Sequence, residues 1–224
     1  MPKVSAQYLA KKKKEIVEAA IRVCETKPVY EITLRDVVRE YGISTGGIYN
    51  YFASIDEILV EILNQAYGEF SYAAEFAEIF ESDNSADKII IDVFKVIGKV
   101  IDSIYVRYGK FIMELDVMLL NDPERGMRMI ANITGNSDSN IFISRLYAFL
   151  DTNIANGVFN PIAPMPHILF TIINSITGIC TIVTTAEHAK GSLLTLGLTE
   201  DECSSAENMM ELLANTMLKL LNPK

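Results

Sequence analysis

Residues 32–57 contain three helix start signals within one short run, which constrains how this part of the chain can fold. Thr33, Ser44 and Ser54 each precede a stretch with helical features. Ser and Thr are favoured at N-cap positions because their side-chain oxygens accept hydrogen bonds from the unpaired N–H groups that open a helix. Thr33 and Ser54 are also followed three residues later by an acidic residue, the spacing of a capping box. The sequence therefore predicts two short helices and the start of a third.

The two short helices have the pattern of a helix-turn-helix. In the first, apolar residues recur at i, i+3, i+4 and i+7, and Gly42 then supplies the left-handed residue that ends a helix. The second, predicted from Thr45 to about Phe52, would bury Ile48 and Phe52 one turn apart. Two short helices joined by a turn that contains Gly are typical of a helix-turn-helix, whose second helix enters the major groove of DNA.

This stretch resembles the DNA-binding signature of the TetR family of bacterial transcriptional regulators, in the residues Thr-Leu-Arg-Asp-Val-Val-Arg-Glu-Tyr-Gly-Ile-Ser-Thr-Gly-Gly-Ile-Tyr-Asn-Tyr-Phe, 33–52. The resemblance covers roughly residues 8–65. It implies an all-α fold with a three-helix DNA-binding head at 1–54 and a helical bundle for ligand binding and dimerisation at 55–224. No strand-like alternation or hairpin signal appears in the sequence, which independently favours an all-α fold.

The resemblance also implies DNA contacts at particular positions. Thr33 would bind a phosphate while capping its helix, and Asn50 is suited to bidentate contact with adenine. The residues in or along the major groove would be Ser44, Thr45, Gly46, Gly47, Tyr49, Asn50 and Tyr51. Tyr51 fits core packing beside Phe52 equally well.

Positive charge gathers at the N-terminal end of an acidic chain. The net charge is −9, yet residues 1–54 hold nine Lys and Arg against six Asp and Glu. Lys11, Lys12, Lys13 and Lys14 form one run, which fits either a solvated helix start or phosphate contact. A basic head on an acidic body is the charge distribution of a DNA-binding module joined to another domain. We expect DNA affinity to depend on this run and on Arg35.

The chain departs from the family pattern where phosphate contacts are common. Family members usually carry Lys or another long polar residue at the position of Thr45, a bulkier residue at Gly47, and Lys at Ala53 and Ile55. Each phosphate contact adds to affinity and to its salt dependence. An alternative is therefore open: an effector-binding helical dimer whose DNA binding is weak or lost.

The remainder reads as a helical bundle with a mainly apolar ligand site. We expect one connector helix from Ile55 toward Phe80, and a break at Gly109 between two further helices. Asn174 and Thr177 lie on a polar stripe of a long helix, which fits either a dimer interface or a pocket wall. The other candidate pocket residues are Tyr105, Tyr108, Phe111, Met113, Phe142, Tyr147 and Phe170. The stripe has no cation, which favours a neutral or lipophilic ligand.

The last two helices, around 168–186 and 206–221, are more apolar than one bundle face requires, which favours a homodimer through them. Two-fold symmetry would place the recognition helices about 34 to 36 Å apart on a pseudo-palindromic operator. The uncharged stretch 152–186 is predicted to be a buried helix and not a membrane span, because many of its residues are hydroxyl-bearing.

No pattern indicates catalysis. His167 and His188 have no acid, nucleophile or metal-ligand cluster near them in sequence. The three cysteines match no metal-ligand spacing. No apolar signal segment follows the basic start, so a cytoplasmic location is expected. We predict no enzyme activity, no cofactor and no bound metal.

Overall fold

The computed structural model describes residues 5–69, 72–134, 137–194 and 205–223. The chain divides into two compact units: unit 1 comprises Met1–Glu69 and Lys110–Gly135, and unit 2 comprises Phe70–Gly109 and Asn136–Lys224. Within the described ranges every regular element is a helix, and one isolated bridge joins Phe159 and Pro223. The predicted all-α fold is confirmed. A functional boundary after residue 54 stays a prediction.

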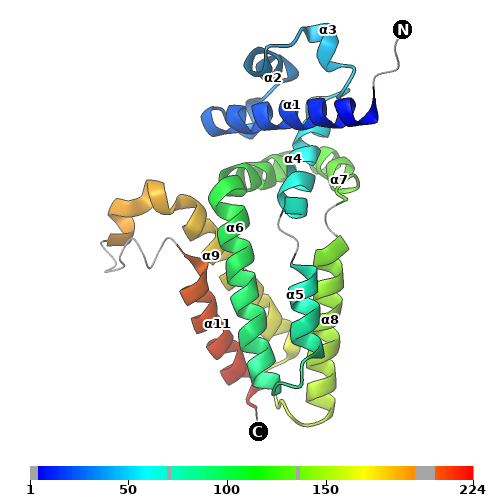
Figure 1. Ribbon diagram of the computed structural model, residues 1–224. Coiled ribbons are helices and arrows are strands. Elements are labelled where there is room, and N and C mark those ends of the chain that lie inside the picture. The colour runs from blue at the N-terminus through cyan, green and yellow to red at the C-terminus, as the bar shows by residue number, and fades with distance from the viewer. Residues whose placement is uncertain (1–4, 70–71, 135–136, 195–204, 224) are drawn as a thin grey trace. The chain divides into compact units, whose positions relative to one another are not determined.

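Unit 1 contains the predicted three-helix head together with parts of later helices (Figure 1). Buried Ile16, Val37, Ile48 and Leu59 bring its helices onto one core. Its elements are α1 (Ala6–Thr26), the 3-10 turn η1 (Val29–Glu31), α2 (Leu34–Tyr41), α3 (Thr45–Ile48), α4 (Ile55–Glu69), the C-terminal part of α6 (Ala86–Asn121) and α7 (Pro123–Ile130).

The local start and stop signals of the head are confirmed. Thr33 and Asp36 form a capping box, and Gly42 ends α2 in the left-handed conformation at φ 79°. Ser54 Oγ accepts from the N–H of Glu57, whose carboxylate accepts from Ala53 N–H. These contacts depend only on residues a few positions apart, which is why the sequence shows them.

Three predicted helix boundaries are wrong. The second helix of the motif ends at Ile48 and continues as a turn toward Phe52, consistent with the low helix propensity of its two glycines. The connector helix ends at Glu69, and a separate helix α5 (Ala73–Glu81) follows. The expected break at Gly109 is absent, since α6 runs unbroken through that residue.

Gly109 serves close helix packing. It is buried, and a Cβ atom added there would lie 2.1 Å from Oγ1 and 3.0 Å from Cβ of Thr184 on α9 (Met165–Leu194). Both distances are shorter than ordinary van der Waals contact, so a side chain at this position would clash with Thr184. The glycine therefore lets α6 and α9 approach within unit 2.

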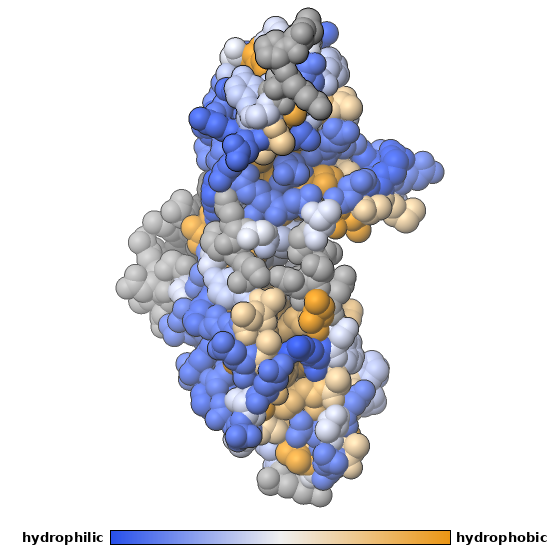
Figure 2. Space-filling model, turned by 45° about the vertical axis from the view of Figure 1, so that its right-hand side comes forward, coloured by the Kyte–Doolittle hydropathy of each residue, from blue (hydrophilic) through white to orange (hydrophobic). Residues whose placement is uncertain are grey.

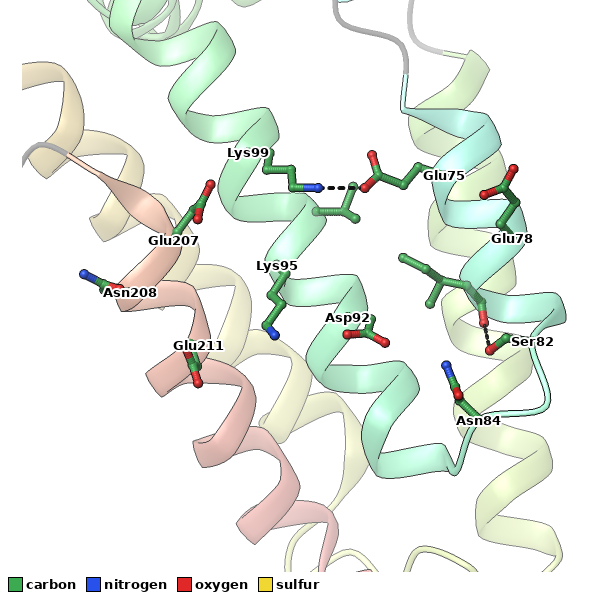
Figure 3. Close-up of a pocket in the computed structure, with 12 residues that line it drawn as sticks. Glu75, Glu78, Ser82, Asn84, Asp92, Lys95, Lys99, Glu207, Asn208 and Glu211 are labelled. Atoms are coloured by element: carbon green, nitrogen blue, oxygen red, sulfur yellow. Dashed lines mark hydrogen bonds and ion pairs between the residues drawn. The ribbon is translucent and has the colours of Figure 1, made fainter.

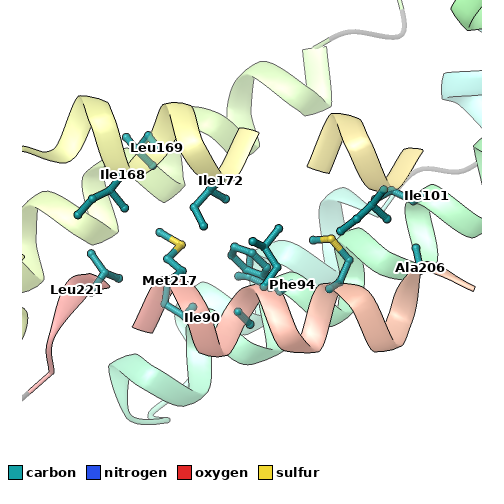
Figure 4. Close-up of a cluster of buried hydrophobic side chains, with 14 of the residues drawn as sticks. Ile90, Phe94, Ile101, Ile168, Leu169, Ile172, Ala206, Met217 and Leu221 are labelled. Carbon is teal, nitrogen blue, oxygen red and sulfur yellow. The ribbon is translucent and has the colours of Figure 1, made fainter. Parts of the chain in front are cut away.

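Unit 2 has its core where α6, α9 and α11 (Ala206–Leu221) meet, and it also contains α5 and α8 (Ser137–Ala155). In Figure 4, Ile172 of α9 and Met217 of α11 lie beside Phe94 of α6 in this core. α11 begins after the N-cap residue Ser205, with Ala206 N–H donating to the carboxylate of Asp102 at 2.7 Å. The sequence also has the capping-box spacing at Thr199 and Glu202, which predicts the start of the last helix there, but these two residues lie outside the described residues.

The uncharged part of α9, Met165–Thr185, is buried on one side only, which corrects the expectation of a buried helix. This segment is long and apolar enough to cross a membrane, with 28% of that window buried. A single such helix is weak evidence of a span. Its threonines and Asn174 bond back to carbonyls one turn earlier, including Asn174 to Phe170 O at 2.7 Å and Thr177 to Ile173 O at 3.1 Å. Their hydroxyl and amide donors are therefore satisfied within the helix.

Replacing Gly109 with Ala should lower the free energy of unfolding by about 1 to 3 kcal/mol, because the added methyl group forces α6 and α9 apart. Urea unfolding measures this change. The matched control is Gly68→Ala on α4, where a Cβ meets nothing within 4 Å. There, stability should rise by up to about 1 kcal/mol through helix propensity. Equal effects at the two positions would show that Gly109 has no packing role.

Candidate DNA-binding and effector sites

The recognition turn presents a short polar surface because its apolar residues point inward. Ile48 and Phe52 are buried, whereas the Tyr49 side chain is 58% exposed and Asn50 is exposed. Ser44 Oγ accepts from Gly47 N–H at 3.1 Å and so caps α3. This arrangement leaves a tyrosine hydroxyl and an amide available for groups on DNA.

The two glycines of α3 differ in their surroundings. A Cβ on Gly46 would meet nothing within 4 Å, whereas one on Gly47 would lie 2.9 Å from Cγ1 of Ile43. Gly47 is therefore fitted against the turn, and Gly46 is the glycine whose exposed backbone is open to a ligand. Ser44 and Thr45 are exposed beside the two glycines. Tyr51 is partly buried, which is compatible both with packing beside Phe52 and with contact to DNA.

The four consecutive lysines on α1 are not equivalent. Lys12 Nζ lies 2.6 Å from Glu15 Oε2 and 2.9 Å from the hydroxyl of Tyr41, which itself donates to Glu15 at 2.6 Å. Hydrogen bonds to Glu15 and then Tyr41 raise the pKa of Lys12. Lys12 thus joins α1 to α2. Lys13 Nζ lies over the Phe52 ring, 5.2 Å from its centroid.

Lys11, Lys14 and Arg35 are exposed, and no ion pair involves them among the described residues. Three of the basic side chains expected to contact DNA are thus accessible to solvent. Thr33 is also exposed, although its hydroxyl donates to Asp36 Oδ2 at 2.7 Å.

Further cations of the head pair with its own carboxylates. Asp36 accepts from Lys27 at 2.8 Å and from Arg39 at 3.1 Å. The hydrogen bond from Lys27, followed by those from Thr33, lowers the pKa of Asp36 from 3.8 to about 2. Arg22 similarly pairs with Glu40 at 2.7 Å. The pairs made by Lys27 and Arg22 link α1 to α2, and sequence spacing does not reveal them because the partners are 9 and 18 residues apart.

The predicted pocket residues are not brought together as one lining. Tyr105 and Phe142 pack against the core of unit 2, and Tyr108 is almost fully buried. Phe111 and Met113 belong to unit 1. The remaining predicted side chains are exposed on α8 and α9: Tyr147, Phe170, Asn174 and Thr177.

A cluster of aromatic side chains lies between α5 and α8 instead. The ring of Phe142 lies 4.2 Å from Phe76 and 6.2 Å from Phe80, measured between centroids. Phe80 lies 5.7 Å from Phe149, which in turn lies 6.3 Å from Phe159. α5 has no buried residue, so these helices cover the core only partly. Hydrophobic side chains are also visible on the surface over this region of unit 2 (Figure 2).

Phe76, Phe80 and Phe149 are absent from the residues predicted for the pocket. Their apolar helical spacing is visible in the sequence, but it is also the spacing of ordinary core residues. Only the packing of α5 against α8 distinguishes them.

A separate hollow of about 540 Å³ in unit 2 is strongly charged. Figure 3 shows it between α5, α6 and α11, where Lys99 Nζ lies 2.8 Å from Glu75 Oε1. Lys95 also lines it, together with the acidic residues Glu75, Glu78, Asp92, Glu207 and Glu211. This chemistry does not suit a neutral or lipophilic ligand, and none of the predicted pocket residues lies there.

Comparisons with known proteins agree with this geometry. The model of the family "Bacterial regulatory proteins, tetR family" matches residues 16–62. YfiR of Bacillus subtilis (strain 168), described as an uncharacterized HTH-type transcriptional regulator, is 26% identical over 182 residues, which are 80% of this chain and 82% of that protein.

Solved structures share the fold over nearly the whole chain. Salmonella enterica GusR superposes with a TM-score of 0.60 at 12% identity, covering 98% of each chain. FadR from Bacillus subtilis, solved in complex with stearoyl-CoA, has a TM-score of 0.52 at 16% identity and covers 93% of this chain and 96% of its own. Residues 16–62, which include the capped helix-turn-helix, thus match the DNA-binding region of the TetR family of bacterial transcriptional regulators, and the whole chain is similar to such regulators in sequence and in its all-α fold.

Proposed function

We propose that the protein is a homodimeric repressor that leaves a pseudo-palindromic DNA operator when a neutral or lipophilic small molecule binds to its helical bundle. The observation that carries this proposal is that the recognition turn exposes polar side chains while its apolar residues are buried. Buried Ile48 and Phe52 hold it, while Tyr49 and Asn50 are turned outward. Hydroxyl and amide groups at the start of such a helix suit phosphate and base contacts. Acting on DNA places the protein in the cytoplasm.

Exposed apolar residues on the last two helices support the dimer. Phe170 is 70% exposed and Ile173 is 57% exposed on α9, and Leu212 is 70% exposed on α11. Burying such side chains against a second copy is favourable, and the back-bonded polar groups between them add little desolvation cost. A two-fold dimer would present two recognition turns to half-sites about 34 to 36 Å apart.

The aromatic cluster between α5 and α8 supports the effector proposal. Phe76, Phe80, Phe142 and Phe149 offer polarizable apolar surface, which suits a hydrocarbon chain. The cation that joins the same two helices, Arg145, is paired with Glu81 at 3.3 Å. FadR from Bacillus subtilis, which has the same fold, binds stearoyl-CoA. An acyl chain between α5 and α8 would favour bundle conformations in which the two heads no longer match the operator.

One observation favours a second candidate, an effector-binding dimer with weak or lost DNA binding. Lys12, Lys27 and Arg39 are committed to carboxylates within the head. Positive charge neutralised in this way contributes less to phosphate binding. The distinction between the two candidates is therefore one of DNA affinity.

Neutralising Lys11 and Lys14 together, as Lys11→Gln and Lys14→Gln, should weaken operator binding and lower its salt dependence. If each lysine contacts one phosphate, the slope of log K against log salt should decrease in magnitude by about 2. Gel shifts with DNA from upstream of the protein's own gene, at several salt concentrations, measure both quantities. Lys12→Gln is the comparison, because Lys12 bonds to Glu15 and should change the slope less. An unchanged affinity and slope in the double variant would refute the role of the lysine run.

Stearoyl-CoA should release the wild-type protein from its operator, and coenzyme A alone should not. Phe142→Ala should raise the stearoyl-CoA concentration needed for release by about tenfold, which corresponds to about 1.4 kcal/mol. Its neighbour Ile143→Ala is the matched control, because Ile143 is 48% exposed on the same helix. Release by coenzyme A alone, or equal responses of the two variants, would contradict a lipophilic effector at the aromatic cluster.

A further inference from the structure

Within unit 1, a side chain of α6 caps the C-terminal end of α1. Lys110 Nζ donates to the carbonyl oxygens of Cys24 at 2.8 Å and Glu25 at 3.0 Å. These carbonyls belong to the last turn of α1, where backbone acceptors lack partners inside the helix. An ammonium group there also interacts favourably with the negative end of the helix dipole. Lys110 therefore fixes where α1 ends.

Glu114, one helical turn beyond Lys110, holds the segment that follows. Its Oε2 accepts from the N–H of Val29 at 2.9 Å, at the first residue of η1. Val29 is only 1% exposed, so water cannot readily replace this acceptor. Leaving such a buried N–H unpaired is unfavourable, because neither protein nor water replaces its acceptor. Lys110 and Glu114 together hold the connection between α1 and α2, the cation as hydrogen-bond donor and the carboxylate as acceptor.

This connection is coupled to the recognition motif. Lys27, the C-cap residue of α1, pairs with Asp36 at 2.8 Å, and Asp36 completes the capping box with Thr33 at the start of α2. α2 in turn packs against α3. A shift of η1 would therefore be passed to the helix-turn-helix through a short series of direct contacts.

A second attachment lies at the other side of the motif, where α4 begins. Arg125 Nε lies 3.0 and 3.2 Å from the two carboxylate oxygens of Asp56, and its Nη2 bonds to the same group. Asp56 is in the first turn of α4, just after the recognition turn, and Arg125 is on α7. Both side chains are largely shielded, at 25% and 33% exposed, which favours a durable bidentate pair. Asn64 Oδ1 also accepts from Thr134 N–H at 2.8 Å.

We propose that Lys110, Glu114 and Arg125 are positioning residues for DNA binding, although none of them lies in the three-helix head. They hold the two segments that flank the helix-turn-helix, so that the recognition turn keeps one orientation. Their polar groups are committed to head residues and do not contact DNA. This inference rests on the proposed function, because it assumes that the head binds operator DNA.

The test compares Lys110→Met, Glu114→Leu and Arg125→Met with the wild type in salt-dependent gel shifts, with urea unfolding of each variant in parallel. Each variant should lose about tenfold in operator affinity, with the slope of log K against log salt unchanged. Lys95→Met is the matched control, since it removes the same charge from α6 at an exposed position that belongs to unit 2. It should bind DNA like the wild type.

Conservative variants separate positioning from general loss of folding. Lys110→Arg keeps a donor for the α1 carbonyls, and Glu114→Gln keeps an acceptor for Val29 N–H, so both should recover most of the affinity. Failure of both to recover it would overturn the proposal, even if Lys110→Met and Glu114→Leu do not fold.

Affinities equal to that of Lys95→Met would also overturn the proposal, and a slope lowered by about 1 would show instead a direct phosphate contact. A wild-type chain that binds no operator DNA at low salt would refute the proposed function itself. By contrast, wild-type DNA binding that the variants leave unchanged would refute only the positioning role.

Discussion

The recognition helix α3 has only four residues, so its orientation depends on the side chains that hold it from behind. A helix this short cannot form stably alone, because nucleation costs more than one turn of hydrogen bonds returns. Ile48 and Phe52 anchor it in the core of the head, and Gly47 allows close contact with Ile43. The surrounding helices therefore determine how Tyr49 and Asn50 are presented, and DNA recognition becomes a property of the whole of unit 1.

Charge in the head serves two tasks that compete with each other. Lys27 and Arg22 fasten α1 to α2 through the carboxylates of Asp36 and Glu40, and Lys12 does so through the Tyr41 hydroxyl. The lowered pKa of Asp36 follows mainly from its hydrogen bond with Lys27, which favours the charged carboxylate. Partly shielded pairs of this kind fix geometry more than they add stability. Cations paired in this way contribute less positive potential toward DNA, so phosphate binding would depend on a few exposed side chains. We therefore expect a well-ordered head with moderate DNA affinity, whose occupancy of the operator would be sensitive to small changes in head orientation.

The sequence predicts what depends on neighbouring residues and fails where distant contacts decide. The caps at Thr33 and Ser44 and the stop at Gly42 are local hydrogen-bonding and φ preferences, and the structure confirms them. Gly109 reads locally as a helix breaker, but its contact with Thr184, 75 residues away, gives it a packing role. The exposed side of α9 and the aromatic contacts between α5 and α8 likewise depend on packing between helices. Within these limits, the family and the recognition turn can be predicted from the sequence, whereas the attachments made by Lys110, Glu114 and Arg125 cannot.

We infer that the head and the Lys110–Gly135 segment behave as one cooperative unit. Native-state hydrogen exchange tests this claim most directly, because it measures the free energy of opening at each amide. The account predicts that slowly exchanging amides of α1 and α4 open together with those of α7 and of residues 110–121, with one shared free energy and denaturant dependence. Amides of α1 that open independently, while α7 and residues 110–121 exchange with α9 and α11, would contradict it.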